Sequence, residues 1–170
     1  MDFIPGRDGE GVPRVLACFM TALLDGHPMQ LVDGGMARRT IVSIHDAIRA
    51  IVLMINNPGQ SVNQIFNVGN RDNEVTMKEL AQLMREAYAE CTGDAVHLRH
   101  PIVDVSSLEF YGEGYEDCDR RMPKLNKAKD LLGWVPTRSL KETILETVTY
   151  YYERYGERPQ AQNMATASQA

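Results

Sequence analysis

The feature that most constrains this chain is an imbalance between its helices and its strands. Four segments carry an apolar face at helical spacing, and each starts or stops at a recognisable signal residue. The segments that predict strands are few, short and far apart in the sequence. Amphipathic helices need a surface on which to bury their apolar faces, and these strands cannot supply a full sheet. The pattern indicates an α/β chain that lacks part of the sheet its helices would cover.

The predicted helices are placed by proline, glycine and capping residues. Pro13 suits the first turn of a helix that stops at Gly26, and Asp46 is a candidate cap for an apolar helix over residues 47–55. Two capping boxes, at residues 76–79 and 139–142, open two further helices, the second running through Tyr155. A shorter helix is expected over residues 124–132, before Gly133.

The predicted strands are rich in apolar and β-branched residues. They cover residues 30–33, 40–44, 65–69, 95–98 and 102–105. Residues 107–122 have no clean period and are dense in Tyr, Gly and charge, which indicates a loop. We expect residues 1–155 to form one portion of a domain and residues 156–170, rich in Gln, Ala and Ser, to be a disordered tail.

Composition excludes several classes of function. The chain has 170 residues and a net charge of −5, without a basic cluster, which argues against nucleic acid as a partner. No apolar run approaches the ~20 residues of a membrane span, and the first residues do not resemble a signal peptide. The three cysteines have no metal-ligand spacing, so we expect no metal site and no disulfide framework. A cytoplasmic protein is the expectation.

Two segments carry residues suited to binding an anion. Residues 31–40 combine a strand, the Gly34-Gly35 turn and the arginine pair Arg38-Arg39, whose guanidinium groups suit phosphate oxygens. The same pattern is also typical of an ordinary hairpin with exposed charge, and that alternative stays open. Residues 111–123 crowd aromatic, acidic and arginine side chains, which fits either a solvated loop or a substrate site.

The order of motifs resembles a known superfamily. LVDGG, RRTIVSIHDAI, IFNVGN, NEVTMKEL, YGEGYEDCDRRMP and LGWVP follow one another as in extended short-chain dehydrogenases/reductases that act on nucleotide sugars, the NAD-dependent epimerase/dehydratase family. Within it, the YGEGYEDCDRRMP segment is similar to UDP-apiose/UDP-xylose synthases and to the UDP-glucuronate decarboxylase of the lipid A aminoarabinose pathway. The openings MDFIPG and GVPRVLACF strengthen the resemblance to the synthases.

The resemblance implies roles for particular residues. It places Arg14 and Tyr115 against the UDP-sugar, Arg39 on the diphosphate, and the strand of Gln30, Leu31 and Val32 beside the uracil. It also implies catalytic roles for Asp117 and Arg121, with Arg121 near the sugar carboxylate. A guanidinium is a poor proton donor, so we expect Arg121 to bind and orient that carboxylate and to stabilise charge as CO₂ leaves.

The resemblance covers only the C-terminal half of a family member. The glycine-rich loop that binds NAD and the Tyr-x-x-x-Lys pair precede the matched region in the family, and this sequence contains neither. We therefore expect the UDP-sugar-binding half of an NAD-dependent UDP-glucuronate decarboxylase or UDP-apiose/UDP-xylose synthase, with most of the Rossmann domain absent and no activity alone. The intact enzyme would be a homodimer. The alternatives are the same half of another nucleotide-sugar epimerase or dehydratase, and a non-catalytic UDP-binding remnant.

Overall fold

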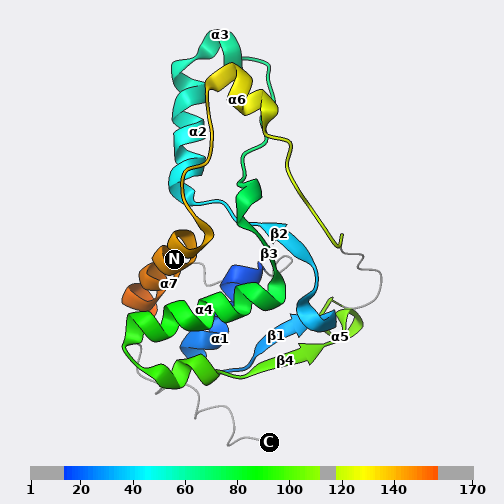
Figure 1. Cartoon of the computed structure of the whole chain (residues 1–170), viewed down its shortest axis with the longest axis vertical. Helices are drawn as coiled ribbons and strands as arrows, with labels where there is room; N and C mark the ends of the chain where they lie inside the picture. Colours follow the sequence, from blue (N-terminus) through cyan, green and yellow to red (C-terminus); the bar gives the residue numbers. More distant parts are fainter. Residues whose placement is uncertain (1–13, 112–117, 157–170) are drawn as a thin grey trace, which may run out of the picture.

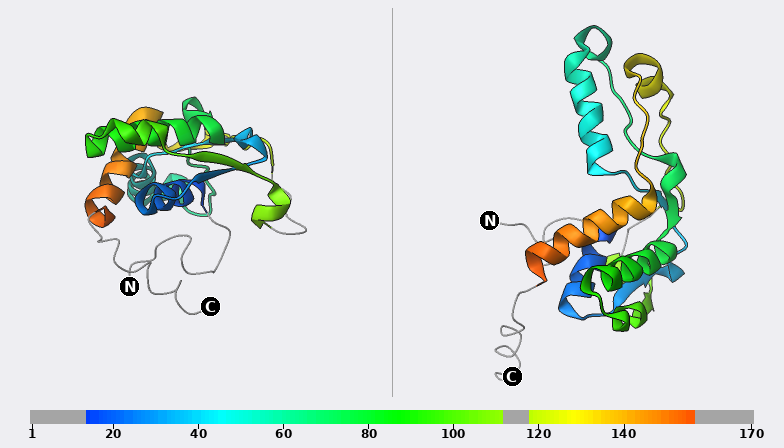
Figure 2. Two further views of the ribbon diagram at one scale, coloured as in Figure 1. Left: turned by 90° about the horizontal axis from the view of Figure 1, so that it is seen from below. Right: turned by 60° about the vertical axis from the view of Figure 1, so that its left-hand side comes forward.

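The structure is a computed structural model that describes residues 14–111 and 118–156. Figure 1 shows a body of helices and strands at one end and a narrower arm, formed by α2, α3 and α6, at the other. The right-hand view of Figure 2 shows the arm projecting from the body. The helix start at Pro13, residues 112–117 of the central loop and all but the first residue of the predicted tail lie outside the described residues.

Helices and strands are interspersed along the first part of the described chain, which ends in the helices α5, α6 and α7. The α-helices are α1 (Val15–Asp25), α2 (Ile44–Asn56), α3 (Pro58–Ser61), α4 (Met77–Thr92), α5 (Ser107–Tyr111), α6 (Asn126–Leu132) and α7 (Leu140–Tyr155). The strands are β1 (Met29–Val32), β2 (Arg38–Thr40), β3 (Glu74–Thr76) and β4 (Ile102–Val105). Short 3₁₀ turns are η1 (Asp33–Gly35), η2 (Arg71–Asn73) and η3 (Ala95–Arg99).

The strands form two separate pairs, which confirms a mixed α/β fold with parallel pairing. β1 runs parallel to β4, with Met29 opposite Ile102, and β2 runs antiparallel to β3, with Thr40 opposite Glu74. β1 and β2 belong to different pairs, so the hairpin interpretation of residues 31–40 is wrong. The physical reason is η1, where three consecutive residues have positive φ and turn the chain away from β1.

Gly35 shows why this turn requires glycine. Its φ is +65°, and a Cβ there would lie 2.9 Å from the Leu31 side chain and 3.0 Å from the backbone nitrogen of Lys78. The turn is fixed further by two carboxylates. Asp104 accepts a hydrogen bond from the Gly34 N–H at 2.6 Å, and Asp33 accepts one from the Ser107 N–H at 3.0 Å.

The main core lies in the body. α1 and α4 both pack against β1, and α4 and α7 lie side by side (Figure 2). Both predicted capping boxes are confirmed, at the N-termini of α4 and α7, and Gly26 ends α1 in the left-handed conformation as expected. The buried apolar residues of this core include Phe19, Met20, Met29, Leu80, Met84, Ile144 and Val148.

A second, smaller core lies in the arm. Ala50 of α2 packs with Ala128, Leu132 and Trp134 of the segment around α6. Phe66 and Val68 are partly buried and pack against the same cluster. Trp134 is buried, and its indole N–H donates to the backbone carbonyl of Asp46 at 2.9 Å. The arm is therefore held by its own apolar contacts rather than by the main core.

Three strand predictions are wrong. Residues 41–43 are not a strand, because the chain leaves β2 at Thr40 and begins α2 at Ile44. Residues 65–69 form no strand pairing within the described chain, and Ile65 is 86% exposed. Residues 95–98 lie in the 3₁₀ turn η3, which Asp94 caps by accepting from the Val96 N–H. β3 was not predicted: it has only three residues, and the last of them, Thr76, is also the first residue of the capping box of α4.

Asp46 does not cap α2. Ser43 is the N-cap, and its hydroxyl accepts from the His45 N–H at 3.2 Å. α2 presents an exposed apolar stripe on its outer side, formed by Ile44, Ile48, Ile51, Val52 and Ile55. Among the described helices none has the length and apolar character needed to cross a bilayer.

Candidate functional site

The two arginines expected to hold the ligand's anionic groups line one open pocket. Arg39 comes from β2 and Arg121 from the segment that precedes α6. The cavity has a volume of about 370 Å³, and its remaining lining residues are Thr40, Val68, Met122 and Pro123. The pocket therefore combines two cations with an apolar wall, at the place where the arm leaves the body.

Residues 118–120 reach this pocket by running along the free edge of β2. The Arg38 N–H donates to the carbonyl of Asp119 at 2.7 Å, and Arg38 and Arg120 form a parallel bridge. The Arg39 guanidinium donates from Nη1 to the carbonyl of Cys118, also at 2.7 Å. β2 thus lies between β3 on one side and residues 118–120 on the other.

Glu74 on β3 contacts Arg38 and Arg120, the residues that directly precede the two pocket arginines. Arg120 Nε and Nη2 donate to the two carboxylate oxygens of Glu74 at 2.5 and 2.9 Å, a bidentate contact. Arg38 Nη1 lies 3.9 Å from Glu74 Oε2. The hydrogen bonds from Arg120 contribute most to lowering the pKa of the Glu74 carboxyl below its ordinary value, and the charge of Arg38 adds to this effect. The group therefore carries its charge at neutral pH.

Three contacts hold the segment after Arg121 against residues 67–71. Arg71 Nε donates to the thioether sulfur of Met122 at 3.2 Å, and Asn67 Nδ2 donates to the carbonyl of Lys124, also at 3.2 Å. Pro123 lies against Gly69 so closely that a Cβ on Gly69 would be 2.6 Å from its ring. The backbone on both sides of Arg121 is therefore fixed by neighbouring elements.

The expected uracil strand is present but its residues do not line the pocket. Gln30 is exposed, Leu31 is buried and Val32 is half-buried on β1. β4 pairs with β1 along one edge, and within the described residues no strand pairs with its other edge. Backbone N–H and C=O groups on that edge could read the hydrogen-bonding edge of a base.

The other expected site residues are not brought to the pocket. Arg14 is exposed at the N-cap of α1 and does not line the pocket. Tyr115 and Asp117 lie outside the described residues, so their roles stay predictions. Cys118 is exposed, and its thiol donates to the Arg120 carbonyl at 3.1 Å.

Sequence reasoning missed Glu74, Arg120 and the apolar wall of the pocket. A signal for Arg120 was present, because each of the two segments suited to binding an anion contains an arginine doublet, Arg38-Arg39 and Arg120-Arg121. Adjacent residues on extended backbone point to opposite faces, so a doublet presents one arginine to each side. No comparable local signal marks Val68 or Pro123 as pocket residues.

The chemistry of the pocket lining limits which ligands suit it. Two guanidinium groups against an apolar wall suit an organic ligand with phosphate or carboxylate groups. Within residues 14–111 and 118–156 there is no cluster of three or more His, Cys, Asp or Glu side chains able to hold a metal ion. These residues do not fit NAD either: β1 leads into the η1 turn and β4 into the five-residue α5, so neither is followed by a glycine-rich loop and a long helix that could cradle a dinucleotide.

Comparison with known proteins agrees with this geometry. Residues 5–69 match the family described as "NAD dependent epimerase/dehydratase family". The chain is 53% identical to UDP-D-apiose/UDP-D-xylose synthase 1 of Arabidopsis thaliana over 159 residues, which are 92% of this chain and 41% of that protein. The chain thus spans about two fifths of the length of the curated relatives it matches.

Solved structures show the same fold. The crystal structure of PbgP3 protein from Burkholderia pseudomallei is 26% identical with a TM-score of 0.69, and the match covers 86% of this chain and 42% of that one. The structure of UDP-glucose 4-epimerase from Thermotoga maritima with UDP-glucose is also 26% identical, with a TM-score of 0.63, covering 89% of this chain and 43% of that one.

Proposed function

Since this chain belongs to the NAD-dependent epimerase/dehydratase family, we propose that it forms the UDP-sugar-binding portion of an enzyme of the UDP-glucuronate decarboxylase or UDP-apiose/UDP-xylose synthase type. The observation that carries the proposal is the pocket that Arg39 and Arg121 line together. A UDP-uronate has two anionic groups, the diphosphate and the sugar carboxylate, and each needs a cation. The names of the relatives support a UDP-sugar as the ligand.

In this proposal Arg39 binds the diphosphate and Arg121 binds the sugar carboxylate. Both are guanidinium groups, which can make two parallel hydrogen bonds to a carboxylate or to a phosphate. The Arg121 guanidinium orients the carboxylate and stabilises negative charge as the carboxylate leaves as CO₂. Asp117 and Tyr115 belong to the same loop as Arg121 and would face the sugar. The backbone of residues 30–32 would read the uracil, and Arg14 would approach the UDP from α1.

We propose that the isolated chain binds a UDP-sugar without converting it. The family is NAD-dependent, and neither the glycine-rich loop nor the Tyr-x-x-x-Lys pair occurs among these 170 residues. The sequence therefore lacks the Tyr–Lys pair that in the family accepts the proton of the sugar hydroxyl as hydride leaves the carbon. Formation of NADH or CO₂ from UDP-glucuronate and NAD⁺ by the purified chain would contradict this part of the proposal.

Titration calorimetry with three ligands tests the binding. UDP-glucuronate should bind more tightly than UDP-glucose and UDP, because only the uronate offers a carboxylate to Arg121. Arg39→Gln should weaken all three ligands by about tenfold or more, as expected for loss of a charge-assisted hydrogen bond. Arg121→Gln should weaken UDP-glucuronate and leave UDP-glucose nearly unchanged. Arg99→Gln, an exposed arginine in η3 away from the pocket, is the matched control.

The same titrations separate the alternatives. Equal affinity for UDP-glucuronate and UDP-glucose, unaffected by Arg121→Gln, would favour an epimerase or dehydratase that does not act on a carboxylate. An absence of binding to all three ligands would contradict a UDP-sugar function for this chain.

A further inference from the structure

We propose that Glu74 and Arg120 are a positioning pair that sets Arg121 opposite Arg39 in the pocket. This inference rests on the proposed function for its choice of ligand. Neither residue lines the pocket, and nothing in the resemblance assigns either of them a role. The proposal rests on the register of three extended segments and on the partly buried carboxylate of Glu74.

The register places the four arginines in two pairs. Arg38 and Arg120 are bridge partners in parallel orientation, so the next residues along, Arg39 and Arg121, are neighbours as well. Side chains alternate between the two faces of extended backbone. Arg38 and Arg120 therefore share one face, and Arg39 and Arg121 share the other; both residues of the second pair line the pocket, and neither residue of the first pair does.

Glu74 holds Arg38 and Arg120 away from the pocket. It lies opposite Thr40 in the β2–β3 register, on the face of Arg38 and Arg120, and its side chain is only 16% exposed. It binds Arg120 through both carboxylate oxygens and lies 3.9 Å from Arg38. The Glu74 carboxylate thus contacts both arginines on its own face. If residues 118–121 shifted by one residue along β2, Arg120 would move into the pocket and Arg121 would move out of it.

Contacts with β2 also hold residues 118–120. Among them are the Arg38 N–H bond to Asp119 and the bridge between Arg38 and Arg120. Arg39 adds a side-chain bond to the Cys118 carbonyl. The bidentate contact between Glu74 and Arg120 adds a side-chain contact that fits one register alone, because a shift by one residue would turn Arg120 to the other face.

Two readouts test the pair in the full 170-residue chain. The first is the ratio of affinities for UDP-glucuronate and UDP-glucose, which reports on Arg121 and which a general loss of structure would not change selectively. We expect Glu74→Gln and Arg120→Gln to lower this ratio about as far as Arg121→Gln does, by about tenfold. Arg120→Lys, which keeps the cation, should retain part of the preference. Glu86→Gln, on the exposed side of α4, should change nothing.

A double variant isolates the mechanism. If Glu74 acts through Arg121, then Glu74→Gln in the Arg121→Gln background should lower the ratio no further. A wild-type ratio in Glu74→Gln, or a further loss in the double variant equal to that of the single variants combined, would overturn the proposal.

The second readout needs no ligand. Hydrogen exchange of the Arg38 amide reports on its bond to Asp119, and the Ile41 amide, which donates to Asn73 on the other side, is the internal control. We expect Glu74→Gln to speed exchange at Arg38 by about tenfold and to leave Ile41 unchanged. If the wild-type chain binds neither sugar nucleotide, the proposed function fails, and exchange at Arg38 alone decides the pairing. Unchanged exchange at Arg38 overturns the proposal in either case.

Discussion

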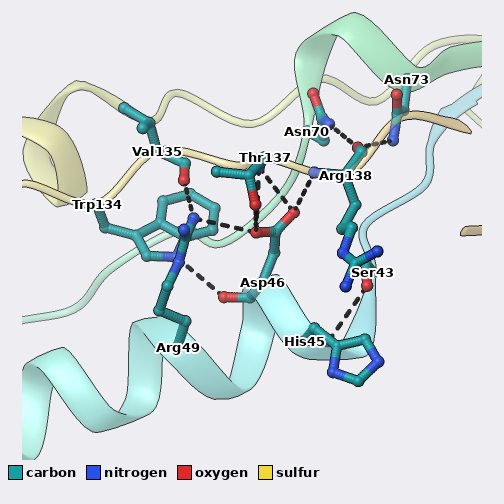
Figure 3. Close-up of polar contacts among 10 residues, drawn as sticks. All are labelled: Ser43, His45, Asp46, Arg49, Asn70, Asn73, Trp134, Val135, Thr137 and Arg138. Carbon is teal, nitrogen blue, oxygen red and sulfur yellow. Dashed lines mark hydrogen bonds and ion pairs between the residues drawn. The ribbon is translucent and has the colours of Figure 1, made fainter. Parts of the chain in front are cut away.

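The carboxylate of Asp46 accepts three hydrogen bonds from Thr137, two from its backbone N–H at 3.0 and 3.1 Å and one from its hydroxyl at 2.9 Å. Figure 3 shows Asp46 on the first turn of α2, reaching across to the segment that precedes α7. The Arg138 N–H adds a further bond at 3.0 Å, and the Arg49 guanidinium contacts the same carboxylate at 3.0 Å. One buried carboxylate therefore fastens the arm to the body.

Further hydrogen bonds lead from the partners of Asp46 toward β3. The carbonyl of Arg138 accepts hydrogen bonds from the amide groups of Asn70 at 2.9 Å and Asn73 at 3.1 Å (Figure 3). Asn70 and Asn73 flank η2, which leads into Glu74 and β3. The polar network thus links α2 to the strand that carries the positioning carboxylate.

Asp46→Asn should lower the free energy of unfolding by about 2–4 kcal/mol, because the amide leaves buried N–H donors facing an N–H₂ group instead of an oxygen. Urea denaturation at neutral pH measures this change. Asp130→Asn, an exposed aspartate on α6, is the matched control and should stay within about 0.5 kcal/mol of the wild type. Equal loss in the two variants would show that the Asp46 contacts contribute nothing specific.

The stabilisation from Asp46 should depend on pH. Burial tends to raise the pKa of this carboxyl, but the hydrogen bonds from Arg138 and Thr137, with the charge of Arg49, outweigh burial and lower the pKa below the ordinary 3.8. A lowered pKa in the folded state means that the stabilisation is complete above pH ~4–5 and is lost as the pH falls through the folded-state pKa. The difference in unfolding free energy between wild type and Asp46→Asn should therefore be constant near neutrality and shrink below pH ~4. A difference that grew on acidification would contradict the lowered pKa.

The sequence predicted those features that depend on neighbours a few residues away. Both capping boxes join residues three apart, so the Thr76–Glu79 pair was visible without knowledge of the fold. Asp46 was misread as a helix cap because aspartate favours that position, whereas its partners lie about ninety residues further along the chain. Residues 65–69 have the composition of a strand, but a strand also needs a partner, and within the described residues they pair with none.

The same difference between local and distant neighbours decides which parts of the candidate site could be predicted. The anion-binding character of Arg39 follows from residue type and from the adjacent glycine turn, and its position in the pocket agrees with that expectation. The pairing of Arg39 with Arg121 required the resemblance, because no local pattern relates residues in two distant segments. The parallel register that brings the doublets together is a tertiary property, and only the structure reveals it.

The exposed stripe on α2 should make the isolated chain associate. Ile44, Ile48, Ile51 and Ile55 follow one another at helical spacing, and each is at least half exposed. A contiguous apolar surface of this kind favours association in water. We expect sedimentation analysis to show a mass that rises with concentration, and Ile48→Glu with Ile55→Glu to restore a monomer. Val96→Glu, which also replaces an exposed apolar residue but in η3, should leave the association unchanged. A strictly monomeric wild-type chain with a sharp melting transition would contradict this prediction.

Gly69 should be intolerant of even one added methyl group. Its Cβ would lie 2.6 Å from the Pro123 ring, so Gly69→Ala should push away the segment that carries Arg121. Forcing a methyl into such a contact costs about 1–3 kcal/mol of unfolding free energy. The displacement should also weaken UDP-glucuronate more than UDP-glucose, since Arg121 moves with Pro123. Gly59→Ala is the matched control, because nothing lies within 4 Å of its Cβ position and its place in the helix α3 should gain stability by about 0.5–1 kcal/mol. If Pro123 is fixed against Gly69, urea denaturation should show a lower free energy of unfolding for Gly69→Ala and a higher one for Gly59→Ala. Calorimetry should show weaker binding of UDP-glucuronate for Gly69→Ala alone. A change of the same sign in both variants would show that Pro123 is not fixed there.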